Sequence, residues 1–255
     1  MNLSCIFDSN PEGYDRWRPR YLPEVFKDII QYAAVSKNSH VIEIGAGTGQ
    51  ATLPFLRTGC TITAIEIGNN FSDFLEEKYR DLSNFTVENI SFEEYQGEKN
   101  SKDLIYSASA FHWIKGNTGF IKSYDLLKND AVLAIFQNTP AIDNLSKELN
   151  DDIQEIYARY MPKSKQKNAK KDHYDNIEEK LQKFGFKDIV FKKYYTKREF
   201  NSKEYVSLLN TYSDHLKMQH EIKPKFESEV TNSIENHGNC IKIQDTIDLC
   251  MAKKL

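Results

Sequence analysis

The most restrictive feature of this sequence is a glycine-rich turn that follows an apolar run. Residues 40–44 read HVIEI, residues 45–49 read GAGTG, and residues 50–56 read QATLPFL, like the first turns of a helix. A buried strand that leads through glycines into a helix N-terminus is typical of nucleotide-cofactor sites. Glycines let the backbone approach a ligand where a Cβ would clash. The sequence therefore predicts a cofactor site at residues 45–49.

The spacing of the three glycines separates two kinds of cofactor. Dinucleotide-binding proteins carry G-x-G-x-x-G after their first strand, whereas this chain has glycine at 45, 47 and 49, followed by Gln50. Glu43 lies inside the strand, two residues before the first glycine, and its negative charge would repel an approaching pyrophosphate. A cofactor with a cationic amino-acid end and no phosphate suits this turn better. The pattern favours S-adenosylmethionine over NAD, and a turn that binds no ligand is the alternative.

A second carboxylate stands at the end of the next expected strand. Residues 61–66 read TITAIE, so Glu66 follows Gly49 by 17 residues. An acid at this place in a βαβ unit can accept hydrogen bonds from both hydroxyls of a ribose. Its charge also disfavours a 2′-phosphate, which argues against NADP. A solvated glutamate at a strand end is the alternative.

Five segments of the chain resemble one protein family. Residues 43–49, EIGAGTG, look like motif I of the class I S-adenosylmethionine-dependent methyltransferases. Residues 14–23 (YDRWRPRYLP) and 107–114 (SASAFHWI) resemble the N-terminal segment and the segment after strand four in one subgroup of that family. Residues 90–95 (ISFEEY) and 208–213 (LLNTYS) resemble further segments of the same subgroup. That subgroup, methyltransferase type 11, contains small-molecule enzymes similar to trans-aconitate methyltransferase.

The resemblance implies a fold and a cofactor arrangement. The fold is of the α/β class, a Rossmann-like seven-stranded mixed sheet in the order 3-2-1-4-5-7-6, with strand seven antiparallel and helices on both faces. S-adenosylmethionine lies across the carboxyl ends of strands one, two and four, and S-adenosylhomocysteine is the product. Glu66 holds the ribose, and Glu43 orients the turn or contacts the methionine ammonium. The implied cofactor-binding residues are Tyr14, Arg18, Glu43, Gly45, Ala46, Gly47, Thr48, Gly49, Glu66, Ile67, Ser91, Phe92, Ser107 and Ala108.

Candidates for catalysis and substrate binding come from the remaining motif residues. His112 follows strand four, and the ordinary histidine pKa of about 6.5 suits a general base; the alternative is that it packs with Trp113 to shape the pocket. Three arginines alternate at 16, 18 and 20 and pair either with a carboxylate substrate or with surface acids. The predicted substrate-binding residues are Arg16, Arg20, Tyr21, Trp113 and His215. The other histidines show no metal-ligand spacing, so no metal is expected.

Composition limits the class of protein. The chain has 255 residues, 40% of them hydrophobic, and a net charge of −3, which gives no global electrostatic footprint for nucleic acid. It lacks an apolar run of about 18 residues, so no membrane-spanning helix is expected. Its first residues do not resemble a signal peptide, and its four scattered cysteines indicate reduced thiols. We therefore expect a cytoplasmic enzyme with a small-molecule partner and of undetermined oligomeric state.

A single methyltransferase domain is predicted over residues 1–255. Within it we expect an N-terminal segment over 1–35, a cofactor-binding core over 36–137, a variable substrate region over 138–188, and a C-terminal part of the sheet over 189–255. Alternating patterns predict the elements. Helices are expected over 22–34, 71–79 (capped by Asn69 or Asn70), 120–127, 145–160, 177–184, 202–215 (capped by Ser202) and 221–236. Strands are expected over 40–44, 61–66, 85–88, 103–108, 131–136, 189–195 and 241–251.

Three functional hypotheses follow. The first is methyl transfer from S-adenosylmethionine to a small molecule, with a carboxylic acid as one candidate class. The second is a protein that binds the cofactor without catalysis, and the third is a methyltransferase acting on RNA or protein. Residues 163–171 hold five lysines and are read as a solvated linker, with a substrate-steering loop or a nucleic-acid contact as alternatives. The acceptor itself is not identified by the sequence.

Overall fold

A computed structural model describes residues 8–143, 147–162 and 177–255. It groups the chain into two compact units. The sheet unit comprises Pro19–Asn138, Asp172–Tyr194 and Ile247–Leu255, and the helical unit comprises Met1–Arg18, Thr139–Lys171 and Tyr195–Thr246. The prediction of one domain stays a prediction, and the predicted lysine-rich linker at 163–171 lies outside the described residues.

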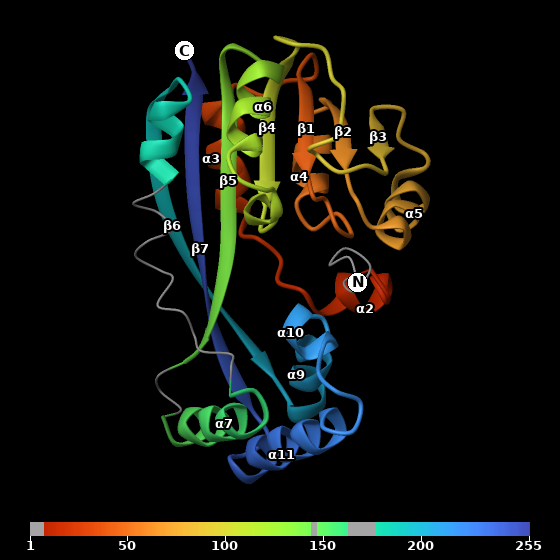
Figure 1. Cartoon of the computed structure of the whole chain (residues 1–255), viewed down its shortest axis with the longest axis vertical. Coiled ribbons are helices and arrows are strands. Elements are labelled where there is room, and N and C mark those ends of the chain that lie inside the picture. Colours follow the sequence, from red (N-terminus) through yellow and green to blue (C-terminus); the bar gives the residue numbers. More distant parts are fainter. Residues whose placement is uncertain (1–7, 144–146, 163–176) are drawn as a thin grey trace. The chain divides into compact units, whose positions relative to one another are not determined.

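Seven strands form one sheet in the order β3-β2-β1-β4-β5-β7-β6, with β7 antiparallel to the others (Figure 1). This confirms the fold class and strand order that the resemblance implied. The strands are β1 (His40–Ile44), β2 (Thr61–Ile65), β3 (Phe85–Glu88), β4 (Lys102–Ala108), β5 (Leu127–Ile142), β6 (Phe186–Phe200) and β7 (Ile241–Lys254).

The first four strands of the sheet run parallel, which brings their carboxyl ends to one edge. β1 pairs with β2 on one side and with β4 on the other, and the register sets Glu43 beside Ala64 and Tyr106. Parallel sheets of this kind bury both faces and bind ligands outside the carboxyl ends of their strands. The glycine turn, which follows β1, therefore lies at the edge where a ligand is expected.

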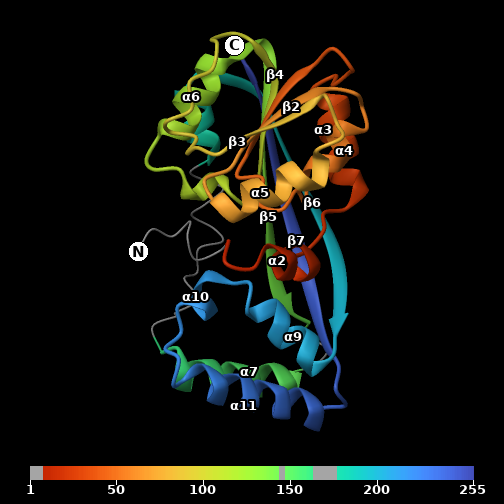
Figure 2. The same ribbon diagram turned by 90° about the vertical axis from the view of Figure 1, so that its right-hand side faces the viewer.

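Helices cover both faces of the sheet unit. Figure 2 shows α6 (Thr118–Leu126) on one face, and α3 (Pro23–Tyr32) and α4 (Thr52–Leu56) on the other. α5 (Asn69–Tyr79) and the 3₁₀ helix η1 (Phe111–Trp113) complete this unit, together with helical residues 177–183. The helical unit holds α2 (Pro11–Trp17), α7 (Lys147–Tyr160), α9 (Ser202–Leu209), α10 (Ser213–Leu216) and α11 (Lys223–Asn236).

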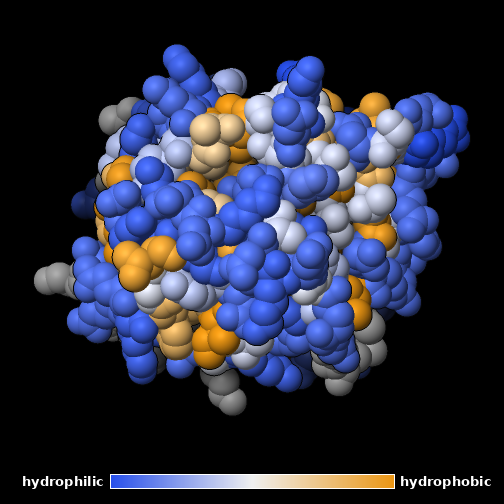
Figure 3. All heavy atoms as spheres, turned by 90° about the horizontal axis from the view of Figure 1, so that it is seen from above, coloured by the Kyte–Doolittle hydropathy of each residue, from blue (hydrophilic) through white to orange (hydrophobic). Residues whose placement is uncertain are grey.

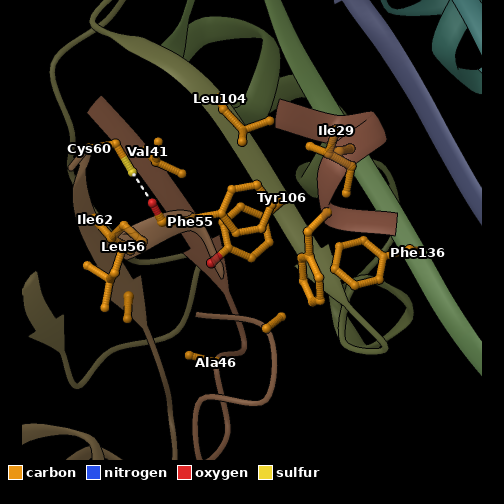
Figure 4. Close-up of a cluster of buried hydrophobic side chains, with 14 of the residues drawn as sticks. Ile29, Val41, Ala46, Phe55, Leu56, Cys60, Ile62, Leu104, Tyr106 and Phe136 are labelled. Atoms are coloured by element: carbon orange, nitrogen blue, oxygen red, sulfur yellow. Dashed lines mark hydrogen bonds between the residues drawn. The ribbon is translucent and has the colours of Figure 1, made fainter. Parts of the chain in front are cut away.

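Two apolar clusters fill the space between the sheet and its helices. Side chains alternate along a strand, so Val41 joins the cluster beneath α3 and α4 while Ile42 joins the cluster beneath α6. In the first cluster the rings of Phe55 and Tyr106 stack with centroids 4.2 Å apart, and the Cys60 thiol donates to the Phe55 carbonyl at 3.3 Å (Figure 4). Aromatic pairs of this kind contribute beyond their buried area, so α4 is held firmly against β4.

The outside of the molecule is mainly polar on the face drawn in Figure 3, where apolar side chains gather only in separate patches. Among the described residues, no helix is both long and apolar enough to cross a membrane. The same residues contain no group of three metal-ligating side chains that could hold an ion.

Two predicted helix caps are wrong. Gly68, not Asn69 or Asn70, is the N-cap of α5, because its carbonyl accepts the first helical hydrogen bond from the Ser72 amide at 2.9 Å and both asparagines fall inside the helix. Asn201, not Ser202, caps α9 through a reciprocal pair of hydrogen bonds with Glu204, the arrangement known as a capping box. The cap of α9 depends on Glu204, a partner that a preference for single residues does not consider.

Several predicted boundaries also need correction. The helix expected over 202–215 is two helices, α9 and α10, separated by residues 210–212. The helix after the glycine turn begins at Thr52 and not at Gln50. β5, β6 and β7 extend well beyond the predicted 131–136, 189–195 and 241–251. The boundary between the two units falls within each of these three long strands. The part of each strand that lies in the helical unit therefore has a burial pattern different from that of the part in the sheet unit.

Candidate functional site

The glycine turn needs glycine at all three positions. The backbone angle φ is +66° at Gly45, +59° at Gly47 and +83° at Gly49, a region that side chains with a Cβ rarely adopt. A Cβ added to Gly45 would lie 2.4 Å from the Cβ of Ala110, so the segment after β4 packs directly against the turn. Both the backbone angles and this close approach agree with a cradle for a ligand.

Helix α5 holds the turn from the opposite side. The Lys78 ammonium donates to the Thr48 carbonyl at 2.8 Å, and the Tyr79 hydroxyl donates to the Gly49 carbonyl at 3.4 Å. Within the turn, the Gln50 amide donates to the Thr48 hydroxyl at 2.6 Å. Thr48 and Ala46 are almost fully buried, so both belong to the packed interior of the turn. No sequence pattern singled out Lys78 or Tyr79, because their role depends on how α5 packs.

Glu66 joins the end of β2 to the turn. One oxygen of its carboxylate accepts from the Gly47 amide at 2.7 Å, and the other accepts from the Gly68 amide at 2.8 Å. Each carboxylate oxygen has a second lone pair, so both retain the capacity to accept a ribose hydroxyl. The next residue, Ile67, is 46% exposed and offers an apolar surface beside that carboxylate.

Glu43 occupies a different environment from Glu66. Its carboxyl is 1% exposed and accepts from the Thr52 hydroxyl of α4 at 2.6 Å. Burial raises the pKa of Glu43 to about 7, while the hydrogen bond from Thr52 and the interaction with Tyr106 partly oppose that rise. Glu43 therefore fits the role of orienting the turn, and direct contact with the cofactor stays a prediction.

The raised pKa corrects part of the sequence argument. A carboxyl with a pKa of about 7 is not fully ionised at neutral pH, so Glu43 repels a phosphate less than its sequence position suggested. Glu66, whose carboxylate accepts two backbone amides, is the second carboxylate near the turn that an approaching phosphate would meet.

Replacing Glu43 with glutamine is expected to change how stability depends on pH. The folded-state pKa is raised from 4.5 to about 7, so the folded protein binds the extra proton and wild-type stability falls as pH rises through that interval. The loss reaches about 3 kcal/mol above the folded pKa. Glutamine cannot ionise and still accepts from Thr52, so the variant should match wild type near pH 5 and exceed it near pH 8. Urea unfolding midpoints of both proteins at about pH 5 and pH 8 test this. The same change in stability between the two pH values for both proteins would contradict it.

The other residues predicted to line the cofactor differ in how they are placed. Ser107 is fully buried and its hydroxyl donates to the Ile44 carbonyl at 3.1 Å, which ties β4 to β1. Phe92 is also buried, within the cluster beneath α6. The Ser91 hydroxyl donates to Glu94 at 2.5 Å, and Ala108 is half-buried at the end of β4. These positions are compatible with indirect support of the site, and direct contact stays a prediction.

A pocket with a volume of about 350 Å³ lies next to the turn, within the sheet unit. Its lining includes Ala110, which packs against Gly45, and His112, whose ring lies 4.8 Å from that of Trp113 between centroids. Tyr21 reaches the same region, because its hydroxyl shares a 2.8 Å hydrogen bond with the Ser109 hydroxyl. The structure therefore brings three predicted residues, His112, Trp113 and Tyr21, to the carboxyl end of β4. His112 packs with Trp113 and lines the pocket, so both of its predicted roles stay open.

The remaining predicted residues belong to the helical unit, apart from the exposed Arg20 of the sheet unit. The Arg18 guanidinium lies over the rings of Tyr14 and Tyr212, at 4.7 and 4.5 Å from their centroids. Arg16 lies 4.9 Å from the Trp17 ring. His215 is buried and its Nε2 shares a 2.9 Å hydrogen bond with the Tyr157 hydroxyl. The first part of the motif at 14–23, up to Arg18, thus meets Tyr212 of the motif at 208–213 within the helical unit.

Comparisons with known proteins agree with this geometry. Residues 42–135 match the family described as a methyltransferase domain. An uncharacterised methyltransferase of Schizosaccharomyces pombe is 21% identical over 239 residues, which covers 91% of this chain and 88% of that protein.

Solved structures share the fold. A protein of Anaeromyxobacter dehalogenans, assigned as a type II methyltransferase, superposes with a TM-score of 0.69 at 16% identity, over 92% of this chain and 97% of that one. Phosphoethanolamine N-methyltransferase 2 of Haemonchus contortus, in complex with phosphomonomethylethanolamine and S-adenosylhomocysteine, gives a TM-score of 0.60 at 14% identity, over 100% of this chain and 60% of that one. The solved structures show the fold, and the domain match and the methyltransferase relatives, taken with the glycine turn and the strand order, support an S-adenosylmethionine-dependent methyltransferase.

Proposed function

We propose that this enzyme methylates a small molecule bound in the pocket beside the glycine turn. The observation that carries the proposal is the shared wall: Ala110 packs against Gly45 of the turn and also lines the pocket of about 350 Å³. That volume lies in the range of small-molecule sites, about 300–1,000 Å³. An acceptor in this pocket would lie next to the cofactor cradle.

The residues present fit S-adenosylmethionine, which supplies an electrophilic methyl group on a sulfonium. The cradle offers backbone groups close to a ligand, and Glu66 offers carboxylate oxygens for the ribose. In this proposal Ile67 and Phe92 flank the adenine. The protein's part in such a transfer is mainly orientation and exclusion of water.

His112 has two possible roles within this proposal. As a general base it would take a proton from a hydroxyl acceptor; as a packing residue it would shape the pocket with Trp113, from which its ring centroid is 4.8 Å away. A carboxylate acceptor has no proton to lose and needs no base. The identity of the acceptor therefore decides the role of His112.

Two measurements test the proposed function: binding of the cofactor, and turnover with cell fractions that contain different classes of acceptor. Calorimetry should show binding of S-adenosylhomocysteine and none of NAD. Incubation with S-adenosylmethionine should then generate S-adenosylhomocysteine when a low-molecular-weight metabolite fraction is added, but not with total RNA or with a protein fraction. Turnover that depends on RNA or protein would overturn the small-molecule assignment. Cofactor binding without turnover in any fraction would favour a non-catalytic protein.

A further inference from the structure

The pocket beside the glycine turn combines apolar walls with a single type of charge. Its walls include Phe111, Phe120, Ile135 and Ile177, three of which are almost fully buried. Its polar lining residues are a serine, a histidine, a glutamine and Lys180, and none of its lining residues is an aspartate or glutamate. A ligand in this pocket would meet apolar surface and a positive charge, but no carboxylate.

Lys180 projects from the helical residues 177–183 and is half-buried. Its ammonium lies 6.0 Å from the centroid of the Phe120 ring, which forms part of the apolar wall. Within the described part of the chain, the ammonium has neither a salt bridge nor a hydrogen bond. Lysines of the neighbouring β6 behave differently, since Lys187, Lys192 and Lys197 each pair with an aspartate at 2.8–2.9 Å.

A ligand with a negative charge would stabilise an unpaired ammonium that lies next to apolar walls. Partial burial removes water from the ammonium without replacing its hydrogen bonds, and charge-assisted hydrogen bonds to a carboxylate are about twice as strong as neutral ones. An amphipathic anion would supply both partners, with its apolar body against the phenylalanines and its carboxylate on Lys180. A neutral or cationic ligand would leave the ammonium unpaired.

We infer that the acceptor is an apolar carboxylate, an alkyl or aryl acid, whose anionic group is recognised by Lys180. This inference rests on the proposed function, because it treats the pocket as the acceptor site. It concerns recognition of the acceptor and leaves open which of its atoms is methylated. Lys180 acts here as a specificity-determining residue.

Two isosteric probes and three variants test this inference by direct binding. Titrations of the S-adenosylhomocysteine complex should show 3-phenylpropionate binding at least about tenfold more tightly than the neutral 3-phenylpropanamide, because only the acid forms a charge-assisted hydrogen bond with Lys180. Lys180→Met and Lys180→Gln should remove that preference, and Lys180→Arg should keep most of it. Lys183→Met is the matched control, because Lys183 is on the same helix but does not line the pocket.

The outcomes separate this inference from the proposed function. Equal binding of acid and amide, no binding of either, or an unchanged preference in the Lys180 variants would overturn the inference, while binding of S-adenosylhomocysteine in the same samples would leave the proposed function standing. Absence of S-adenosylhomocysteine binding would instead count against the proposed function. Thermal unfolding of each variant, expected to match wild type, shows that a lost preference is not a lost fold.

Discussion

Replacing Glu66 with alanine should weaken S-adenosylhomocysteine binding by about 10²- to 10⁴-fold, because two hydrogen bonds to a charged acceptor contribute about 1.5–3 kcal/mol each. In the folded chain the Glu66 carboxylate also accepts from the amides of Gly47 and Gly68, at 2.7 and 2.8 Å. Its removal therefore loosens the cradle as well as deleting the ribose partner. Calorimetric titration of both proteins with S-adenosylhomocysteine measures the loss.

Glu88→Ala is the matched control for this result. Glu88 is the last residue of the neighbouring strand β3, and the register sets it beside Ile65, the residue before Glu66. Its backbone carbonyl accepts from the Glu66 amide at 3.1 Å, a bond that alanine preserves. We expect nearly unchanged affinity for this control. If Glu66→Ala also bound the cofactor product as wild type does, the ribose assignment would be refuted.

The parts of the fold that the sequence could predict are those written in local patterns. The run at 40–44, the glycines after it and the β-branched run at 61–66 each carry their own signal, because burial on both faces requires continuous apolar strands. The strand order came from resemblance and not from these patterns. No periodicity along one segment specifies its neighbours in a sheet.

The role of Glu43 illustrates what local patterns cannot give. The sequence places it in a strand before the turn, but its partner Thr52 comes from α4, and Tyr106 comes from β4. Its raised pKa arises from that burial. A prediction of charge at this position therefore needs the packed structure, and the sequence alone suggested a full negative charge.

The sequence does not predict the pocket beside the glycine turn for the same reason. Its walls come from segments that follow β4, from β5, from α6 and from residues 177–183, which are separated by up to about 70 positions in the chain. Lys180 belongs to no motif, whereas the arginines at 16–20 do, so the sequence predicts that those arginines bind an acidic substrate. The hydrogen bond between Tyr21 and Ser109 likewise joins residues 88 positions apart. Only the fold brings these groups together.

Replacing Gly45 with alanine is the second change with a large expected effect. The positive φ of +66° costs an L-residue about 1–2 kcal/mol. The added Cβ would also lie 2.4 Å from the Cβ of Ala110, an overlap of the kind that costs about 1–3 kcal/mol in a packed core. We therefore expect the free energy of unfolding to fall by about 2–5 kcal/mol, together with a marked loss of S-adenosylhomocysteine binding. Urea unfolding and calorimetry measure the two effects.

Two further variants separate the backbone cost at Gly45 from the steric overlap. Gly238 has a positive φ of +87° and no atom within 4 Å of an added Cβ, so Gly238→Ala should lose only the backbone part, about 1–2 kcal/mol. Combining Gly45→Ala with Ala110→Gly removes the opposing Cβ and should restore the steric part, leaving a loss similar to that of the Gly238 variant. This non-additivity is expected for residues in contact. The contrary result is simple additivity, in which the double variant is less stable than Gly45→Ala by the full cost of Ala110→Gly alone. In that case the turn and the segment after β4 would not be packed against each other, and Ala110 would not form a wall shared by the cradle and the pocket.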